Sequence, residues 1–364
     1  MPEASTARPA LDKKRSVILG ILWVAVIVFI FLRVIPQVGS SYKDAVTALE
    51  SMSAGAVACI VLSLLVYLLV YGLPFMAATP GLAYWRSQQL NQAAYVITKC
   101  VPGGSAFGLG VQYEMLASYG VGATVSTAAI TAVGVWSVFV TLGLLVLGVA
   151  AIQLSGHAAS SYFWPAVVGV LALAVAILAF GFFVRSEDAA RRVGSIGNGI
   201  AAPFVRRFRK GRNFDLVPAA VKLRADIADL VTRRWLAITG AQTSVSITQF
   251  LIFYMSLRGV EGWGAAETSM LVAFGAFAVA QIGLMIPITP GGLGTVDATM
   301  IAVLIALGVD AGAATAADLV WRSASLVPQI MVGLVALLTW SRQESRALAK
   351  REATRRERTG GVES

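Results

Sequence analysis

Charged residues are scarce in this sequence. Of its 364 residues, 13% are charged and 57% are hydrophobic, and the mean hydropathy is +0.76. A large soluble domain needs more charged surface than this composition supplies. The composition therefore excludes such a domain and predicts a protein that crosses a membrane several times.

Histidine and cysteine are nearly absent, which narrows the chemistry. The single histidine, His157, falls in a short polar turn, and the two cysteines, Cys59 and Cys100, fall in apolar segments. These residues are too few for a metal cluster, a histidine-based catalytic triad or a disulfide framework. We therefore expect no enzymatic activity, no metal ion and no cofactor.

Basic residues are plentiful but unevenly distributed. The net charge is +10, and 23 of the 29 lysines and arginines lie in segments 1–16, 185–234 and 342–358. Basic segments that flank membrane spans stay in the cytoplasm, so both termini are expected there. A basic face also suits anionic lipid headgroups. Nucleic acid is not an expected partner, because the basic residues flank spans rather than alternate with stacking aromatics.

The order of polar and apolar segments predicts two membrane halves. A polar tail (1–16) precedes the first half (17–184), a basic cytoplasmic segment (185–234) separates it from the second half (235–341), and a charged tail (342–364) follows. Apolar residues at helical spacing in the basic segment predict an amphipathic helix on the inner membrane surface. They are Leu216, Ala220, Leu223, Ile227 and Leu230. A solvated linker helix is the alternative.

Apolar runs of sufficient length predict about eight crossings and an all-α polytopic membrane protein. The runs cover 17–32, 54–73, 123–154, 162–184, 235–257, 265–285, 290–307 and 313–340. The first is interpreted as a retained span, because no small-residue cleavage site follows it.

Proline and glycine interrupt the apolar regions at two places. Neither Pro102-Gly103-Gly104 nor Pro290-Gly291-Gly292 can continue a helix. Broken backbone at membrane depth is tolerated only where it is buried in protein or lines a wet cavity. The motifs are 188 residues apart, and the same offset gives ten identities over residues 102–130. We therefore expect an internal repeat with broken or re-entrant helices at both sites, as in transporters with a midplane site.

The distribution of charge makes the two breaks unequal. If all basic segments lie inside, segment 91–119 must enter and leave on one side, whereas 290–307 must cross once. Either one span is misassigned or the second break lies within a full crossing. The sequence leaves both possibilities open.

Five charged residues lie within the apolar regions, where charges usually face a cavity or a partner. They are Lys99, Glu114, Asp297, Asp318 and Arg322. Asp318 and Arg322 are four residues apart and can pair on one helix face. Structural interpretations also exist: an ion pair that only holds the bundle together, a Lys99 that reaches the interface, and an Asp297 that caps a helix.

The functional interpretation joins the breaks and the charges. Half-helices that begin after Pro102 and Pro290 present free N–H groups that favour an anion, and Lys99 and Arg322 add positive charge. The expected ligand is a lipid phosphate headgroup, with the carboxylates balancing the cations or relaying a proton. The candidate binding residues are Lys99, Pro102, Gly103, Gly104, Glu114, Pro290, Gly291, Gly292, Gly294, Asp297, Asp318 and Arg322.

The second break and the residues after it resemble a known family. The segment reads Pro287-Ile288-Thr289-Pro290-Gly291-Gly292-Leu293-Gly294-Thr295-Val296-Asp297-Ala298, and Gly308-Val309 and Trp321-Arg322 follow. This pattern is similar to that of the bacterial flippase-like membrane domain found in lysylphosphatidylglycerol synthetases and in stand-alone relatives. The resemblance covers about residues 15–341, and the first break matches more loosely. Asp297 stands where the family usually has glutamate, and Trp321 where tyrosine is typical.

The resemblance implies a helical bundle in the bacterial cytoplasmic membrane, with broken helices at its centre. The implied activity is the movement of a lipid or lipid-linked intermediate between leaflets. Because the sequence ends at Ser364, without room for the soluble aminoacyl-transferase domain of the fused members, we expect no lipid aminoacylation. Membrane lipids with anionic headgroups are the expected partners, and an enzyme of envelope biosynthesis is a candidate partner.

Two other functions stay open. A membrane enzyme acting on a polyprenyl or phospholipid phosphate would bring two or more acids or histidines together beside a cavity. An envelope scaffold that docks through 185–234 would have no internal cavity, and Arg322 and Asp297 would face lipid or be fully paired. The repeat with paired breaks favours transport over both.

Overall fold

The computed structural model describes residues 47, 50–101, 104–156, 163–208, 216–264, 268–285 and 294–360. Within these ranges the chain forms helices and turns and no strand. Five of the described helices are long and apolar enough to cross a membrane, which makes this a multi-pass membrane protein. The first expected span (17–32) and residues 102–103 and 286–293 of the two breaks lie outside the described residues.

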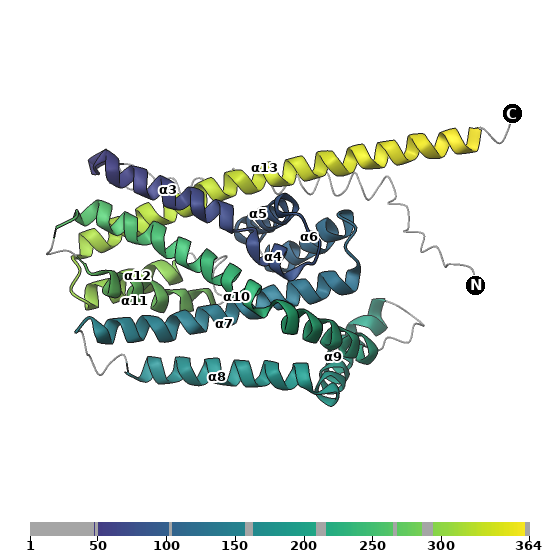
Figure 1. Cartoon of the computed structure of the whole chain (residues 1–364), viewed down its shortest axis with the longest axis horizontal. Coiled ribbons are helices and arrows are strands. Elements are labelled where there is room, and N and C mark those ends of the chain that lie inside the picture. Colours follow the sequence, from purple (N-terminus) through teal and green to yellow (C-terminus); the bar gives the residue numbers. More distant parts are fainter. Residues whose placement is uncertain are drawn as a thin grey trace.

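The helices form one bundle (Figure 1). Their bounds are α3 (Ala54–Val70), α4 (Leu73–Ala78), α5 (Tyr84–Cys100), α6 (Gly104–Ser118), α7 (Ala123–Leu154), α8 (Phe163–Arg185), α9 (Glu187–Phe208), α10 (Val217–Glu261), α11 (Met270–Ala280), the 3-10 helix η3 (Gln281–Met285), α12 (Thr295–Ala306) and α13 (Ala311–Gly360). The span expected at 123–154 coincides with α7.

The expected span 54–73 continues past Pro74. Proline has no N–H, and its ring clashes with the carbonyl four residues earlier, so α3 ends at Val70 and α4 begins at Leu73 with Pro74 in its first turn. Together the two helices make one apolar span from Ala54 to Ala78.

Polar side chains of α5 cover the break between α3 and α4. The hydrogen-bond donors are Tyr84, Ser87, Gln88 and Asn91. The acceptors are the backbone carbonyls of Leu68, Leu69, Tyr71 and Gly72. Each carbonyl left without a donor in hydrocarbon costs several kcal/mol. This requirement explains why a helix inside the bundle carries so many amides and hydroxyls.

Two pairs of short helices lie at opposite ends of the bundle (Figure 1). At one end α6 packs against α5, and a Cβ on Gly104 would lie 2.2 Å from the Ile97 carbonyl oxygen. At the other end α12 packs against α11 and η3, where the Thr295 hydroxyl donates to the Gly283 carbonyl at 3.2 Å. Glycine therefore permits the close approach at Gly104.

The segment expected to cross at 290–307 contains only a short helix. Its described part, α12, has 12 residues and is about 18 Å long at 1.5 Å per residue. The hydrocarbon core is about 30 Å thick. α12 by itself therefore does not make the expected full crossing.

The internal repeat is visible in the backbone. α7 begins at Ala123 and α13 at Ala311, which are 188 residues apart. Before each helix stands a glycine with positive φ, 87° at Gly120 and 90° at Gly308. The next residue closes the same turn in both halves: Val121 donates to the carbonyl of Leu116 at 2.9 Å, and Val309 to that of Leu304 at 3.0 Å. Glycine suits this left-handed helix ending.

Two expected boundaries fall inside continuous helices. α10 runs unbroken from Val217 to Glu261, so the amphipathic helix and the span predicted at 235–257 are one element. The apolar face of its first part is buried in the protein, since Ile227 is 0% exposed and Leu230 8%. The predicted separate surface helix is therefore wrong. Likewise α13 continues past residue 341 to Gly360.

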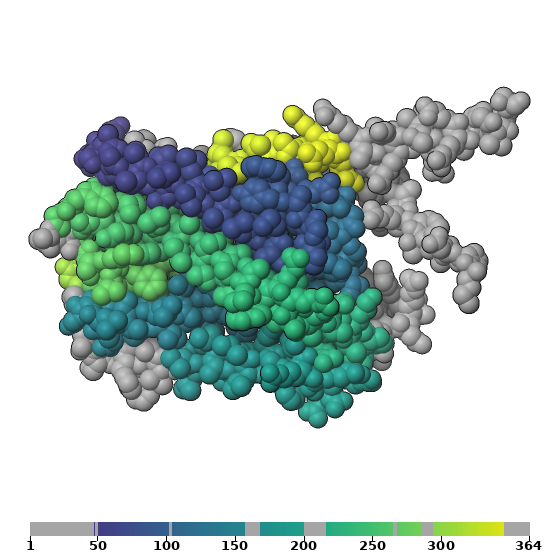
Figure 2. Space-filling model, in the orientation of Figure 1, coloured from purple at the N-terminus to yellow at the C-terminus, as the bar shows by residue number. Residues whose placement is uncertain are grey.

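Aromatic packing fixes the second half around α13. Trp321 is buried and meets the rings of Phe253 on α10 and Phe277 on α11, both at 5.9 Å between centroids. The space-filling view shows α3, α10 and α8 forming a continuous face of the molecule (Figure 2). The neighbour of Trp321, Arg322, is thereby held at the interior of the bundle.

Candidate functional site

A cavity of about 420 Å³ lies inside the bundle, lined by residues of α3 to α7, α10 and η3. Its polar lining consists of tyrosines, amides and hydroxyls. Among the described lining residues, Lys99 carries the one formal charge. A cavity with this lining can accept a hydrated or anionic group within an otherwise apolar bundle.

Three tyrosines form one wall of the cavity. Their rings meet edge to face, with centroids 5.5 Å apart for Tyr67 and Tyr71 and 5.7 Å apart for Tyr71 and Tyr95. The Tyr67 hydroxyl donates to Oε1 of Gln329 on α13 at 2.9 Å and accepts from Nε2 of Gln249 on α10 at 3.4 Å. Such a buried network fixes the wall because each change of rotamer would cost a hydrogen bond.

Lys99 lies in the last turn of α5, where the helix dipole favours a cation. Its Nζ lies 5.8 Å from the centroid of the Tyr95 ring. Lys99 is also close enough to Arg322 and Asp297 to interact with both electrostatically. The charged residue of the first break therefore lies beside the charged residues of the second, as predicted.

Asp297 and Arg322 form a partly buried ion pair. The Asp297 side chain accepts from the Gly294 N–H at 2.6 Å and from Nε of Arg322 at 2.6 Å, and a second guanidinium nitrogen contacts the same carboxylate oxygen. The two side chains are 20% and 19% exposed. The guanidinium carbon lies 4.6 Å from the centroid of the Trp321 ring. Asp297 thus caps α12 and positions Arg322 at the same time.

Asp318 does not make the predicted ion pair with Arg322. Its side chain is 3% exposed and faces the carboxyl group of Asp297 at hydrogen-bonding distance. Within the described part of the chain, the ion pair of Arg322 is with Asp297. The guanidinium reaches across to α12, where the Asp297 carboxylate is already oriented by Gly294. Two carboxyl groups this close can hold one proton between them.

Glu114 lies apart from this cluster, in contrast to the prediction. It is exposed on α6, and its charged neighbour is Glu344 on α13. Ten residues separate it from Gly104, which is about 15 Å along the helix. The start of α6 therefore belongs to the site and Glu114 does not.

The remaining predicted residues divide into two groups. Gly104 and Gly294 lie at the starts of α6 and α12. The others lie outside the described residues: Pro102, Gly103, Pro290, Gly291 and Gly292.

Sequence reasoning did not identify the tyrosine wall. Tyr67 and Tyr71 are four residues apart, and so are Asn91, Tyr95 and Lys99 in succession. Residues four apart share one helix face. Polar aromatic residues at this spacing within otherwise apolar helices were the available signal.

Comparison with known proteins places these residues within one family. The family model described as the lysylphosphatidylglycerol synthase TM region matches residues 17–333, which include Lys99, Asp297, Asp318 and Arg322. No curated protein matches the sequence. The match and the five apolar helices identify a multi-pass membrane protein of lipid-related function. The chain belongs to the family of the lysylphosphatidylglycerol synthase transmembrane region.

Proposed function

We propose that this protein moves a phospholipid or a lipid-linked phosphate between the leaflets of the bacterial cytoplasmic membrane, without covalent chemistry. The observation that carries the proposal is the polar cavity with Lys99, enclosed by apolar helices and adjacent to the Asp297–Arg322 pair. A phosphate headgroup loses its hydration when it enters hydrocarbon. Tyrosine, amide and lysine donors along the cavity would replace part of that hydration.

The short helix pairs support two re-entrant hairpins. α5 has 17 residues and α6 has 15, so they are about 25 and 22 Å long. Neither matches the hydrocarbon thickness of about 30 Å. α11 with 11 residues and α12 with 12 are shorter still. Each pair would enter the membrane and return on the same side.

This arrangement resolves the conflict between the breaks and the charges. With both pairs re-entrant, the expected span 17–32 and the five long helices give six crossings instead of eight. The basic segments 1–16, 185–234 and 342–358 then all fall on one side, the cytoplasmic one. The two hairpins enter from opposite sides, which is the architecture of inverted-repeat transporters with a midplane site.

The test is lipid translocation in proteoliposomes. Headgroup-labelled phospholipids and polyprenyl phosphates are followed by quenching from outside, with the wild-type protein, Lys99→Gln, and Lys222→Gln as the matched control on the exposed face of α10. We expect movement by the wild type and the control, and a rate at least about tenfold lower for Lys99→Gln, because one charged hydrogen bond contributes about 1.5–3 kcal/mol. If the wild type moves none of these lipids, the proposal fails.

The convergence of Asp297 and Asp318 favours a second candidate, an enzyme acting on a lipid phosphate. A general acid or base must reach its substrate, and neither aspartate is among the residues that line the cavity. Transport is therefore the better-supported function. Mass spectrometry of the same vesicles decides: release of a headgroup or phosphate by the wild type, but not by Asp318→Asn, would establish the enzyme.

The scaffold alternative predicted a bundle without an internal cavity. The cavity of about 420 Å³ counts against it.

A further inference from the structure

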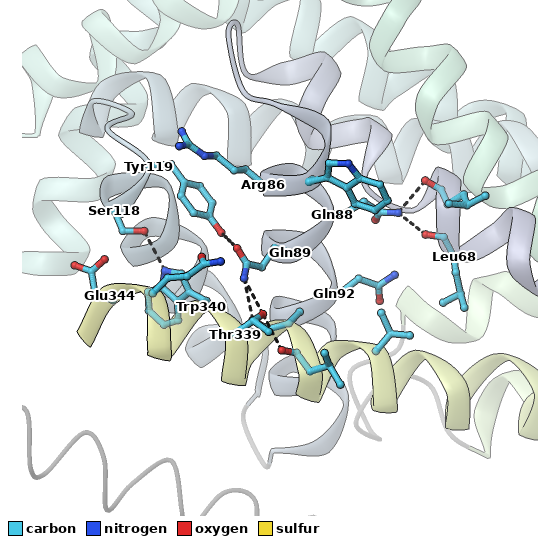
Figure 3. A pocket seen from close by; sticks show the side chains of 16 residues that line it. Leu68, Arg86, Gln88, Gln89, Gln92, Ser118, Tyr119, Thr339, Trp340 and Glu344 are labelled. Carbon is cyan, nitrogen blue, oxygen red and sulfur yellow. Dashed lines mark hydrogen bonds between the residues drawn. The ribbon is translucent and has the colours of Figure 1, made fainter. Parts of the chain in front are cut away.

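A second hollow, the lateral groove, lies between α3, α5, the end of α6 and α13 (Figure 3). It has a volume of about 690 Å³ and shares no lining residue with the central cavity. Trp85, Arg86 and Glu344 lie toward the end of the bundle that carries the basic segments, and Leu69, Val332 and Val335 lie deeper. The groove is therefore polar at one end and apolar at the other.

Gln92 supplies an unsatisfied amide to this groove. Its side chain projects from α5 toward α13 (Figure 3) and is 2% exposed. In the part of the chain that the structure describes, neither its Nε2 nor its Oε1 has a hydrogen-bond partner. An amide buried without partners costs free energy, so its position is explained best by a ligand with polar atoms at that depth.

The polar end of the groove holds opposite charges that do not neutralise each other. Arg86 lies over the ring of Tyr119 at 5.5 Å, and the Tyr119 hydroxyl is fixed by donating to Gln89 at 2.8 Å. Glu344 lies on α13 at the same end and has Glu114 as a neighbour. Over the described ranges, no ion pair includes Arg86 or Glu344. The end therefore presents a guanidinium on one wall and carboxylates on another.

The deeper walls open toward lipid. Leu69 is 53% exposed and Val335 58%, and in a membrane such side chains contact acyl chains. Trp85 is 72% exposed beside Arg86, a combination typical of the headgroup level. From Glu344 back to Val332 the groove follows α13 for twelve residues, about 18 Å. These dimensions fit a membrane lipid that lies along α13 with its headgroup at the polar end, rather than a free phosphate.

We propose that the lateral groove binds one phospholipid whose headgroup carries both a phosphate and a primary amine. Arg86 receives the phosphate, because a guanidinium matches its oxygens in a two-point contact. Glu344, with Glu114 nearby, accepts hydrogen bonds from the ammonium group. The Gln92 amide lies about 9 Å deeper along α5 and donates to the glycerol ester carbonyls. This site is separate from the central cavity and does not depend on transport.

Native mass spectrometry of the detergent-solubilised full chain tests the proposal. The protein is titrated with dioleoyl phosphatidylethanolamine, phosphatidylglycerol and phosphatidylcholine. We expect the ethanolamine lipid to bind about tenfold more tightly than the glycerol lipid, as one charged hydrogen-bond pair requires. The choline lipid should bind like the glycerol lipid, because its quaternary ammonium has no N–H to donate.

Variants separate the two ends of the headgroup. Glu344→Gln should remove the preference for ethanolamine, whereas Arg86→Gln should weaken the ethanolamine and glycerol lipids alike by about tenfold. Arg342→Gln, an exposed residue of the same helix, should behave as the wild type. Because the preference compares two lipids on one protein, partial unfolding lowers both and does not change the ratio. Equal binding of the two lipids by the wild type, tighter binding of the glycerol lipid, or a preference that survives Glu344→Gln would each overturn the proposal.

Discussion

Asp297 has two roles, as the cap of a helix and as the acceptor of an ion pair. Its carboxylate holds the Gly294 N–H at the start of α12 and the Arg322 guanidinium from α13. The two roles reinforce each other, because the cap fixes the carboxylate before the arginine reaches it. Removal of either charged partner leaves a partly buried charge without its counter-ion.

Unfolding in mixed micelles measures this coupling. Asp297→Asn keeps an acceptor for Gly294 but removes the charge, and Arg322→Gln removes the other charge. Each is expected to lower the free energy of unfolding by about 3 kcal/mol. The double variant should lose less than the sum, with a coupling energy of about 1–3 kcal/mol.

The exposed pair of Glu187 and Arg191 on α9 is the control for this cycle. Its side chains are 50% and 59% exposed, so Glu187→Gln and Arg191→Gln should each cost less than about 0.5 kcal/mol. Additive effects of Asp297→Asn and Arg322→Gln would contradict the described ion pair.

At the scale of elements, the contact between α5 and α13 separates the central cavity from the lateral groove. Gly333 makes this contact close: a Cβ there would lie 2.2 Å from Cγ2 of Val96 and 2.5 Å from the carbonyl oxygen of Gln92. The second distance is to backbone, which cannot move aside as a side chain can. Glycine at this position therefore sets the distance between the two helices.

Gly333→Ala should push α5 and α13 apart and lower the free energy of unfolding by about 1–3 kcal/mol. Gly143→Ala is the matched control on α7, because a Cβ there meets nothing within 4 Å. The control should be neutral or stabilise by up to about 1 kcal/mol, since alanine favours a helix over glycine. Both are measured by thermal unfolding monitored at the helical circular dichroism band. A stabilising Gly333→Ala would show that the contact is not close.

At the scale of the whole molecule, the repeat places equivalent helices in opposite directions. α7 runs from the end that holds α5 and α6 toward the end that holds α11 and α12, and α13 runs back (Figure 1). The first residues of these helices, Ala123 and Ala311, are equivalent in the repeat and both exposed. They should therefore lie on opposite sides of the membrane.

Cysteine labelling in intact cells tests this orientation. In a background with Cys59→Ala and Cys100→Ala, the variant Ala311→Cys should react with a membrane-impermeant maleimide from outside. Ala123→Cys should react only after permeabilisation, because it lies on the side of the basic segments. The background protein without cysteine shows the level of unspecific labelling. Reaction of both positions from the same side would rule out the inverted arrangement.

Much of the architecture follows from local properties of the sequence. Composition determines the membrane class, the apolar run at 123–154 has the same limits as α7, and the repeat offset of 188 residues recurs in the turns at Gly120 and Gly308. These features are predictable because hydrophobicity, proline and glycine act on the residues next to them. For the same reason the position of charged residues near the breaks was recognised.

The tertiary structure alone decided which side chains meet. Arg322 contacts Asp297, 25 residues away, rather than Asp318 one turn earlier, and Tyr67 bonds Gln329 across 262 residues. Glu114 lies beside Glu344 instead of Asp297. Helical spacing gives the direction of a side chain but not the helix that it faces. That choice depends on the distances between packed helices, which contacts such as the one at Gly333 determine and which no local pattern encodes.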